Sequence, residues 1–398
     1  MSMGILFLLG KYPGDGGVEM VTTCLANRFV SEGKRVAIVS FFQSDERGID
    51  GLDKSVNLYK LDCPIVTNAN IRRLQSILKT EGINIIINQW CLPYYATRLC
   101  RKAMQGHPNC KLLAVHHNAP NMNARIENCN VKLSKECAFL PRLSAKLCLK
   151  LTKIVTGVSL RMVYHYSDRY IVLSDSFRPI FRKITGLKRT PRLITLSNPV
   201  TLIDEDFQYS FLNKQKEILY VGRIDYNQKK TFRLLDVWHL LETRFPDWSL
   251  RIVGEGPDLP NLRAYAEKLK VSRVFFEGFQ KPLEYYKRAS LLLLTSEYEG
   301  FGLVIVEGMG LGVVPVVNGS YSAVYDIIDP LSGTIVDASH GFDKKAMAEA
   351  LACYMSDEGR LQQSALNAME NVKRYSMDTM SNLWNNLFES LIKELPTC

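Results

Sequence analysis

The sequence predicts an α/β protein with two doubly wound domains. Along most of its 398 residues, short apolar runs alternate with amphipathic segments long enough to form helices. This alternation is typical of parallel sheets covered by helices. Eleven of the apolar runs have the length of strands, which is more than one open sheet of usual size contains. The chain is also longer than a single hydrophobic core usually supports, so we expect two sheets in two domains.

The predicted strands of the first half are apolar on both faces, as in strands buried between two helical layers. The segment Met1–Gly10 contains the first of them and lacks the basic start and small-residue cleavage site of a signal peptide. No apolar run reaches the roughly 18 residues that a membrane-spanning helix needs. These strands are Ile5–Leu9, Val36–Phe41, Ile83–Asn88, Leu112–Val115, Tyr170–Leu173 and Leu193–Leu196.

A polar stretch separates the two halves of the chain. Ser197-Asn-Pro199 and the polar residues 204–210 interrupt the alternation before a new strand begins at Ile218. We therefore expect domains at 1–198 and 199–375, followed by an exposed amphipathic helix within 376–398. The strands of the second half are Ile218–Val221, Leu250–Val253, Val274–Glu277, Leu291–Thr295 and Val313–Val317.

The charge is divided unevenly between the halves. Residues 1–200 hold 29 basic and 13 acidic residues, whereas residues 201–398 hold 21 and 27, which together give the net charge of +10. A basic half favours nucleic acid, an anionic membrane or an anionic substrate as partner. Nucleic acid is the least favoured, because the basic residues lie among aliphatic rather than aromatic side chains. The ten cysteines have no metal-site spacing, which indicates reduced thiols and a cytoplasmic location.

Much of the basic excess falls in residues 131–161. This segment contains a single acid, Glu136, and has the pattern of a basic amphipathic helix pair. Such a pair can lie peripherally on an anionic membrane surface, or it can be a solvated helical face packed on the sheet; both interpretations stay open. The basic residues are Lys132, Lys135, Arg142, Lys146, Lys150, Lys153 and Arg161.

The strongest local signal is the segment Glu299-Gly-Phe-Gly-Leu-Val-Ile-Val-Glu307, which follows an apolar strand. Its glycines allow a tight turn, and the helix that follows directs its first amides toward an anion. Carboxylates there can accept hydrogen bonds from sugar hydroxyls. Acids favoured by the helix dipole are the simpler explanation, which fits Glu299 better than Glu307.

Three further segments follow predicted strands. Arg223 with Lys229 or Lys230 could converge on a diphosphate. Gly16-Gly17 resembles an anion-binding turn before a helix, although it matches neither the dinucleotide nor the P-loop pattern. His116-His117 follows another strand, where ligands of open sheets bind, although either histidine could be structural.

The residues together resemble the GT-B glycosyltransferases of family four. The resemblance is carried by Tyr220-Val-Gly-Arg223, Ile252-Val-Gly-Glu-Gly-Pro257, Phe276-Glu-Gly278, Ser296–Gly302 and Arg374-Tyr-Ser376, in the order and spacing of that family. It implies two Rossmann-like domains facing across a cleft, with the last helix crossing back to the N-terminal domain. It also implies an enzyme that transfers a hexosyl unit, with retention, from a nucleotide sugar to a glycan or lipid-linked acceptor, as in lipopolysaccharide or capsule synthesis.

The resemblance implies roles for individual residues. Arg223 and Lys230 would hold the donor diphosphate, with Lys229 as the alternative; the glycine that usually follows this lysine in the family is replaced by Thr231. Gly16 and Gly17 would contribute from the other domain. The backbone amides that would assist are those of Gly300, Phe301, Gly302 and Leu303.

Four side chains would surround the rest of the donor. Glu307 would bind the ribose, Glu299 the transferred hexose, and His117 the hexose near its reacting carbon, with His116 as the alternative. Glu255 would border the donor site. The family favours uridine over guanosine, and its front-side mechanism needs no dedicated nucleophile.

We expect no metal cofactor. The triplet Asp204-Glu-Asp206 resembles a metal-binding motif but does not follow a strand end, so we interpret it as charged linker. Two alternatives to a glycosyltransferase are a sugar-nucleotide epimerase or phosphorylase of the same fold, and a membrane-binding scaffold without enzymatic activity.

Overall fold

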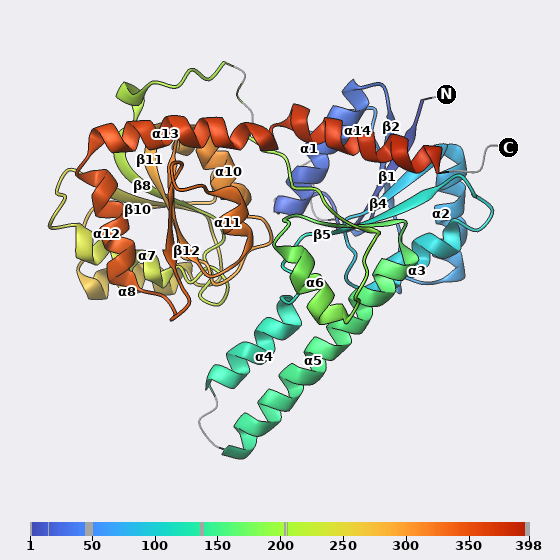
Figure 1. The fold of residues 1–398 in the computed structure, drawn as a ribbon, viewed down its shortest axis with the longest axis horizontal. Helices are drawn as coiled ribbons and strands as arrows, with labels where there is room; N and C mark the ends of the chain where they lie inside the picture. Colours follow the sequence, from blue (N-terminus) through green and yellow to red (C-terminus); the bar gives the residue numbers. More distant parts are fainter. Residues whose placement is uncertain are drawn as a thin grey trace. The chain divides into compact units, whose positions relative to one another are not determined.

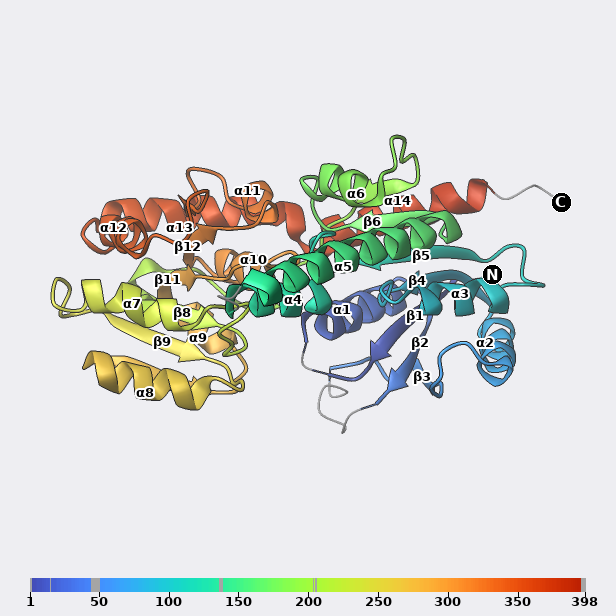
Figure 2. The same ribbon diagram turned by 90° about the horizontal axis from the view of Figure 1, so that it is seen from below.

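The computed structural model describes residues 2–14, 16–43, 51–135, 139–202, 204 and 206–394. The chain divides into unit 1, formed by Met1–Thr201 and Met377–Cys398, and unit 2, formed by Leu202–Ser376. Each unit contains one parallel sheet with helices on both faces (Figures 1 and 2). The predicted α/β class with two sheets is therefore confirmed.

The sheet of unit 1 has seven strands in the order β3-β2-β1-β4-β5-β6-β7, all parallel. The order reverses between β1 and β4, as in doubly wound folds. The strands are β1 (Gly4–Lys11), β2 (Arg35–Phe42), β3 (Asn57–Lys60), β4 (Ile83–Asn88), β5 (Lys111–His116), β6 (Arg169–Val172) and β7 (Leu193–Thr195).

Helices cover both faces of this sheet because successive side chains of each strand point to opposite sides. Leu6 and Leu8 of β1 belong to the core cluster beneath α2 and α3, whereas Phe7 stacks on Phe29 of α1 with ring centroids 6.2 Å apart. The helices of unit 1 are α1 (Gly17–Ser31), α2 (Asn68–Thr80), α3 (Tyr94–Ala103), α4 (Ala124–Lys135), α5 (Phe139–Tyr166), α6 (Phe177–Thr185) and α14 (Met377–Lys393).

The C-terminal helix α14 is amphipathic, and its polar face is exposed as expected. Phe29 of α1 packs edge-on against Trp384 and Phe388, at centroid distances of 6.4 Å and 5.4 Å. Asn385 donates a hydrogen bond to Glu32 at 2.9 Å. The apolar face of α14 is thus buried on α1, beside which it lies (Figure 1).

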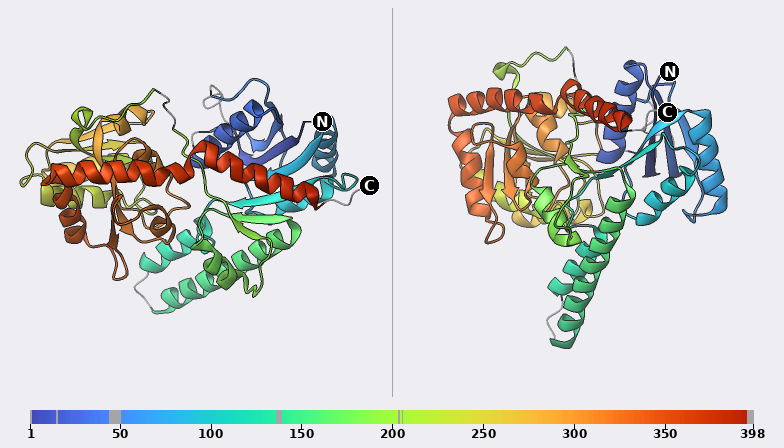
Figure 3. Two further views of the ribbon diagram at one scale, coloured as in Figure 1. Left: turned by 45° about the horizontal axis from the view of Figure 1, so that its top comes forward. Right: turned by 45° about the vertical axis from the view of Figure 1, so that its right-hand side comes forward.

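Residues 131–161 form the end of α4 and most of α5, the predicted helix pair; Glu136 lies outside the described residues. The two helices form a hairpin that extends away from the sheet of unit 1 (Figures 1 and 3). Within the described part of the chain, no helix combines the length and the apolar character needed to cross a membrane.

The sheet of unit 2 has six parallel strands in the order β10-β9-β8-β11-β12-β13. Its strands are β8 (Gln215–Val221), β9 (Ser249–Val253), β10 (Val274–Gly278), β11 (Ala289–Leu294), β12 (Val314–Gly319) and β13 (Thr334–Asp337). Its helices are η1 (Phe211–Asn213), α7 (Phe232–Leu241), α8 (Leu259–Leu269), α9 (Leu283–Arg288), α10 (Leu303–Gly310), α11 (Ala323–Ile327), α12 (Lys344–Met355), α13 (Glu358–Val372) and η2 (Lys373–Tyr375).

Two strands, β3 and β13, were not predicted from the sequence. Each has four residues and lies at the edge of its sheet. Because an edge strand has one neighbour only, most of their side chains are partly or fully exposed. Neither strand therefore contains the continuous apolar run by which the buried strands were recognised.

Candidate active site

The sheet of unit 2 changes direction between β8 and β11. The chain proceeds outward from β8 through β9 to β10 and restarts at β11 on the other side of β8. In open parallel sheets, ligands bind beyond the carboxyl ends of the strands at such a switch point. The loop after β8 contains Arg223, Lys229 and Lys230, and the loop after β11 contains Glu299. The predicted site residues of these two loops thus lie at the switch point.

The loop after β8 presents Arg223 to solvent. The hydroxyl of Tyr220, buried in β8, donates a hydrogen bond to the carbonyl oxygen of Arg223 at 2.8 Å. The guanidinium of Arg223 lies 3.1 Å from a carboxylate oxygen of Asp225 and 3.3 Å from the side-chain oxygen of Gln228. The Arg223 side chain is 57% exposed, and a guanidinium has five N–H donors, so donors remain available to an anion.

The loops after β8 and β9 are in direct backbone contact. The amide of Ile224 donates to the carbonyl oxygen of Glu255 at 2.8 Å. A Cβ atom on Gly254 would lie 1.9 Å from the carbonyl oxygen of Gly222, and Gly254 has a φ of +141°. Only glycine fits this approach. The glycines of the segment Ile252–Pro257 therefore allow the two loops to pack, and they leave the side chain of Glu255 exposed.

Lys229 and Glu299 form a largely buried ion pair that joins the two loops of the switch point. Lys229 Nζ lies 2.6 Å from Glu299 Oε1, and Ser296 Oγ donates to the same oxygen at 2.7 Å. The two charged side chains are only 15% and 9% exposed. The carbonyl oxygen of Gln228 also accepts a hydrogen bond from the amide of Glu297 at 2.7 Å, which holds the loops together beside the pair.

Lys230 lies at the turn into α7 and has an unusual backbone conformation. Its φ is +52°, in the left-handed region that favours glycine, whereas Thr231 has a φ of −60°. The carbonyl oxygen of Lys230 accepts a hydrogen bond from the amide of Arg233 at 2.9 Å. Of the two adjacent lysines, the structure therefore brings Lys229 against Glu299.

The loop after β11 ends at the N-terminus of α10. Gly302 precedes the helix with a φ of +95°, and a Cβ atom there would lie 3.0 Å from Cδ1 of Ile305. Considering the described residues, no side chain caps this terminus and its first turn holds no acid. The simpler explanation of Glu299 as an acid of the first helical turn is therefore wrong. The first amides of α10 point toward the loop that contains Gly300.

Phe301 and Leu303 differ in how they can contribute to this turn. The Phe301 side chain is buried and packs edge-on against Tyr375, with ring centroids 5.3 Å apart. The Leu303 side chain is partly exposed at the first helical position. Because the Phe301 ring is buried, the group that it can offer a ligand at this turn is its backbone amide.

Glu307 lies on the second turn of α10 and is 9% exposed. The hydroxyl of Tyr286 donates a hydrogen bond to Glu307 Oε2 at 3.3 Å. Burial, together with the charge of Glu307, raises the pKa of Tyr286 well above its usual value. The hydroxyl therefore stays protonated and orients this carboxylate as a donor.

Polar residues at the end of β12 and directly after it surround the same loop and were missed in the sequence analysis. The side chains of Asn318 and Ser320 donate to the carbonyl oxygen of Ser296 at 3.3 Å and 2.6 Å. Within the described residues, the hydroxyls of Tyr321 and Ser322 are buried without a hydrogen-bond partner. The signal was present in the polar run 318–322 directly after an apolar strand, which is the pattern that identified the other loops.

Unit 1 has a switch point of its own between β1 and β4. Gly16 precedes α1 with extended backbone, and a Cβ atom on it would lie 2.3 Å from Oε2 of Glu19. Gly17 is the first residue of the helix, and Asp15 lies outside the described residues. The predicted Gly16-Gly17 turn thus lies at the start of α1, after the carboxyl end of β1.

The two histidines at the end of β5 have different surroundings. His116 is buried, with Nδ1 at 3.0 Å from the Tyr170 hydroxyl and 3.4 Å from Cys91 Sγ. His117 is partly exposed and pairs through Nε2 with the side-chain oxygen of Gln89, which follows β4. His117 is therefore the histidine beside the switch point of unit 1.

Both histidines are neutral at pH 7. Burial lowers the pKa of His116 to about 4. Burial, with a smaller contribution from the charge of His116, also lowers the pKa of His117. A neutral imidazole has one N–H donor and one acceptor nitrogen, so His117 can hydrogen-bond a hydroxyl without adding charge.

The acidic triplet at 204–206 is paired with a neighbouring lysine. Lys287 Nζ lies 2.6 Å from a carboxylate oxygen of Asp204 and 2.8 Å from one of Glu284. Asp206 is exposed, and Glu205 lies outside the described residues. The ion pair between Asp204 and Lys287 fits the interpretation of this triplet as charged linker.

Known proteins resemble the chain over its second half and over its full length. Residues 203–374 match the family model of the glycosyl transferases group 1. An uncharacterized glycosyltransferase from Haemophilus influenzae is 24% identical over 371 residues, which cover 89% of this chain and 94% of that protein.

Two further proteins resemble it at lower coverage or identity. A GalNAc-alpha-(1->4)-GalNAc-alpha-(1->3)-diNAcBac-PP-undecaprenol alpha-1,4-N-acetyl-D-galactosaminyltransferase from Campylobacter jejuni is 25% identical over 57% of this chain and 61% of its own length. The structure of HepE from Anabaena in complex with UDP and glucose has a TM-score of 0.72 and 16% sequence identity, and the match covers 98% of this chain and all of HepE.

Proposed function

Because the chain belongs to the glycosyl transferases group 1 family and has the GT-B architecture, we propose that it is a retaining hexosyltransferase. It moves a hexosyl unit from a nucleotide-diphosphate sugar to a cell-surface glycan or a lipid-linked acceptor. The observation that carries the proposal is the Lys229–Glu299 ion pair at the switch point of unit 2, with Arg223 in the same loop. It combines positive charge for a diphosphate with a carboxylate for sugar hydroxyls.

The donor diphosphate is held by Arg223, Lys229 and the amides of Gly300–Leu303. An ammonium has three N–H donors, so Lys229 can bind a phosphate oxygen while it keeps its contact with Glu299. The positive φ of Lys230 supports Lys229 in this role, because Lys230 then occupies the position that is usually glycine in the family. Lys230 remains the alternative.

The two acids bind the sugar and the ribose. Glu299 accepts hydrogen bonds from hydroxyls of the transferred hexose, and Glu307 accepts them from the ribose. The buried hydroxyl of Tyr321 supports a sugar or nucleotide beside Glu299, because such a ligand would supply the partner that it lacks among the described residues. Glu255 borders the site from the exposed side of the neighbouring loop.

Unit 1 contributes the Gly16-Gly17 turn and His117. The first amides of α1 add donors for the diphosphate. The neutral imidazole of His117 contacts the hexose near the reacting carbon, and Gln89 holds that ring in place. His116 is less suited to this role because it is buried against Tyr170 and Cys91.

The reaction follows from these positions. The bond between the anomeric carbon and the diphosphate oxygen breaks, and a bond from the acceptor hydroxyl forms on the same face of the sugar. The acceptor proton passes to the leaving diphosphate. Preorganised positive groups stabilise the charge that develops on this leaving group, which is where electrostatic catalysis is strongest. This reaction needs neither a divalent metal nor a dedicated nucleophile.

A UDP-sugar is the favoured donor, and GDP-mannose is the alternative. HepE, which shares the fold, binds UDP and glucose. We propose a lipid diphosphate as the carrier of the acceptor, since the name of the Campylobacter relative includes PP-undecaprenol. We further propose that the enzyme works in the cytoplasm, peripherally attached through residues 131–161 to an anionic membrane that holds such acceptors.

The test is nucleotide release from a panel of UDP- and GDP-hexoses with candidate acceptors. Glu299→Gln and Arg223→Ala should each lower kcat/KM by about 100-fold, the usual cost of removing one preorganised polar contact. Glu349→Gln and Arg244→Ala are matched controls, because both side chains are exposed and pair with each other beyond the other end of α7. No turnover of any donor, or site variants that behave like the controls, would contradict the proposal.

Product analysis separates transfer from the alternatives with the same fold. Transfer gives a new glycoside with the donor's anomeric configuration, whereas an epimerase changes the sugar without an acceptor. NMR spectroscopy of the product distinguishes these outcomes directly.

A further inference from the structure

The α4–α5 hairpin exposes an apolar surface that the proposed transfer reaction does not use. At the base of the hairpin, Leu160, Val163 and Tyr164 of α5 are buried in unit 1. Toward the tip, seven apolar side chains of α5 are each between 52% and 73% exposed. One of them, Val155, lies to one side of the other six, which we name the α5 stripe: Leu140, Leu143, Leu147, Leu151, Ile154 and Val158.

The α5 stripe runs straight along the helix. Its members follow one another at intervals of three, four, four, three and four residues, which place 18 residues on five turns. This spacing equals the roughly 3.6 residues per turn of a straight α-helix rather than the 3.5 of a supercoiled pair. A straight stripe fits a flat apolar layer along its whole length, whereas a partner helix would have to follow the 3.5-residue repeat.

The charges around the α5 stripe have a single sign. Residues 139–166 contain no Asp or Glu. Arg142, Lys146, Lys150 and Lys153 are exposed on one flank of α5, at roughly 60–145° around the helix from the centre of the stripe. Within the described residues, none of these four cations takes part in an ion pair. Their charge is therefore available to an anionic surface.

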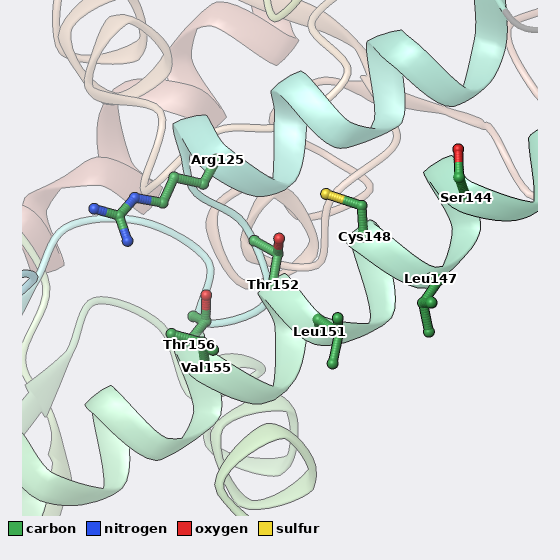
Figure 4. A pocket seen from close by; sticks show the side chains of 8 residues that line it. All are labelled: Arg125, Ser144, Leu147, Cys148, Leu151, Thr152, Val155 and Thr156. Carbon is green, nitrogen blue, oxygen red and sulfur yellow. The ribbon is translucent and has the colours of Figure 1, made fainter. Parts of the chain in front are cut away.

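An open hollow adjoins the stripe on its other flank. It has a volume of about 460 Å³ and lies between α5 and the start of α4. Leu147, Leu151 and Val155 line it, and Arg125 of α4 and Ser144 lie toward its opposite ends (Figure 4). Most of the lining is apolar, with a guanidinium at the edge, which matches a lipid chain and its phosphate.

We propose that the α5 stripe inserts into the boundary between headgroups and acyl chains of an anionic bilayer. The helix lies in the plane of the membrane, and the lysine flank binds lipid phosphates. The hollow beside Arg125 accommodates one lipid chain. This inference rests on the proposed function and deepens it. It assigns the contact with the membrane that holds a lipid-linked acceptor to one face of α5. The vesicle contact itself does not depend on the donor chemistry.

The experiment is sedimentation with large vesicles of phosphatidylcholine containing 30% phosphatidylglycerol. We expect wild-type protein to bind these vesicles and to bind pure phosphatidylcholine at least about tenfold more weakly. Leu147→Asp/Leu151→Asp should reduce binding by about tenfold or more, because it places charge in the apolar layer. Lys146→Ala/Lys150→Ala/Lys153→Ala should have a similar effect and should lose the dependence on salt.

Two control variants match these changes elsewhere. Leu212→Asp alters a leucine that is 93% exposed in unit 2. Lys54→Ala/Lys60→Ala/Lys79→Ala removes three exposed lysines of unit 1 outside the hairpin. Both should bind vesicles as wild type does. Since all altered positions are exposed, each variant should keep the wild-type melting temperature within about 2 °C, which excludes unfolding as the cause.

Three outcomes would overturn the inference: wild-type protein that does not bind anionic vesicles, hairpin variants that bind as the controls do, or a wild-type dimer that both hairpin variants convert to monomers. The last would identify the stripe as an interface between copies of this chain. Donor binding, measured on the same variants without vesicles, separates this inference from the proposed function. Vesicle binding without any binding of nucleotide sugars would leave the inference standing and overturn the transferase.

Discussion

At the scale of residues, backbone conformation distinguishes two adjacent lysines that the sequence leaves equivalent. Lys229 and Lys230 both follow β8, and either spacing could reach a diphosphate. The sequence does not show which residue takes the left-handed φ at the turn into α7. In the structure Lys230 takes it, and Lys229 lies against Glu299. The acids were easier to predict, since the seven residues between Glu299 and Glu307 fix their places on the turn and on the helix.

The two lysines should therefore differ in their effect on activity. Lys229→Ala should lower kcat/KM by about 100-fold or more, because it removes the cation that joins Glu299 and the diphosphate. Lys230→Ala should change it less than about fivefold, and Lys230→Gly should be tolerated because glycine accepts a positive φ. Steady-state nucleotide release measures all three. Equal losses for both alanine variants would contradict the assignment.

His116 should make the protein sensitive to acid. Its pKa is about 4 in the folded protein and about 6.5 in an unfolded chain. Between these values the unfolded chain binds the extra proton, so stability falls as the pH drops below 6.5. As the pH falls from 7 to 5, the free energy of unfolding should decrease by about 2 kcal/mol because of His116 alone.

Urea unfolding at the two pH values tests this expectation. His116→Gln should unfold more easily at pH 7, because it disturbs the contacts with Tyr170 and Cys91. Its further loss between pH 7 and pH 5 should be smaller than that of wild type by about 2 kcal/mol. An equal pH dependence in the two proteins would contradict the lowered pKa of His116 in the folded state.

At the scale of elements, the buried strands are the easiest to recognise in the sequence. All eleven predicted strands overlap strands of the structure, because each contains a short apolar run, and most of these runs are buried. The edge strands β7 and β10 keep such a run although they are less buried. The edge strands β3 and β13 lack that run. The element that covers the apolar face of α14 was not predicted, because an apolar stripe on a helix shows that something covers it but not which element does. Here the covering element is α1, more than 350 residues earlier in the chain.

The contact between the loops after β8 and β9 should depend on Gly254. Gly254→Ala would place a Cβ atom 1.9 Å from the carbonyl oxygen of Gly222 and strain a positive φ. We expect a loss of about 3 kcal/mol or more in unfolding free energy. Gly106→Ala is the matched control, with a φ of +91° and open space around the added atom, and should cost about 1 kcal/mol. Equal costs in thermal or urea unfolding would contradict the close approach.

Mild oxidation should form a disulfide across the α4–α5 hairpin. Cys129 Sγ and Cys148 Sγ lie 3.6 Å apart across the two helices, and a disulfide needs about 2.05 Å, so a small movement suffices. An aromatic disulfide such as dipyridyl disulfide should oxidise the pair and itself be reduced to two thiol molecules. Peptide mapping by mass spectrometry should find the Cys129–Cys148 bridge. Its absence, with other cysteines oxidised first, would contradict the described packing of the hairpin.

At the scale of the whole molecule, the two sheets repeat one organisation with different charges. Each sheet reverses its strand order once, and each has glycine-rich or polar loops beyond the switch point. The C-terminal half is acidic overall, yet it contains the candidate diphosphate site. Arg223, Lys229 and the N-terminus of α10 can bind an anion there because electrostatics at short range depends on nearby groups rather than on net charge.

The sequence predicts the sheets, the loops that carry the candidate site and the family, because each depends on local runs and fixed spacings. It leaves out Asn318, Ser320 and Tyr321, whose part in the site depends on β12 lying next to β11. The choice between the histidines likewise depends on a three-dimensional contact, since Gln89 comes from a neighbouring strand. Such long-range neighbours have no signature in the local sequence.

The central claim is that the switch point of unit 2 binds a nucleoside diphosphate, and calorimetric titration with UDP and GDP tests it most directly. We expect wild-type protein and Arg244→Ala to bind at least one of them with the same Kd. Arg223→Ala and Lys229→Ala should each weaken that Kd by about tenfold or more, because each removes a charge-assisted contact to phosphate. Wild-type protein that binds neither nucleotide, or site variants with the wild-type Kd, would contradict the account.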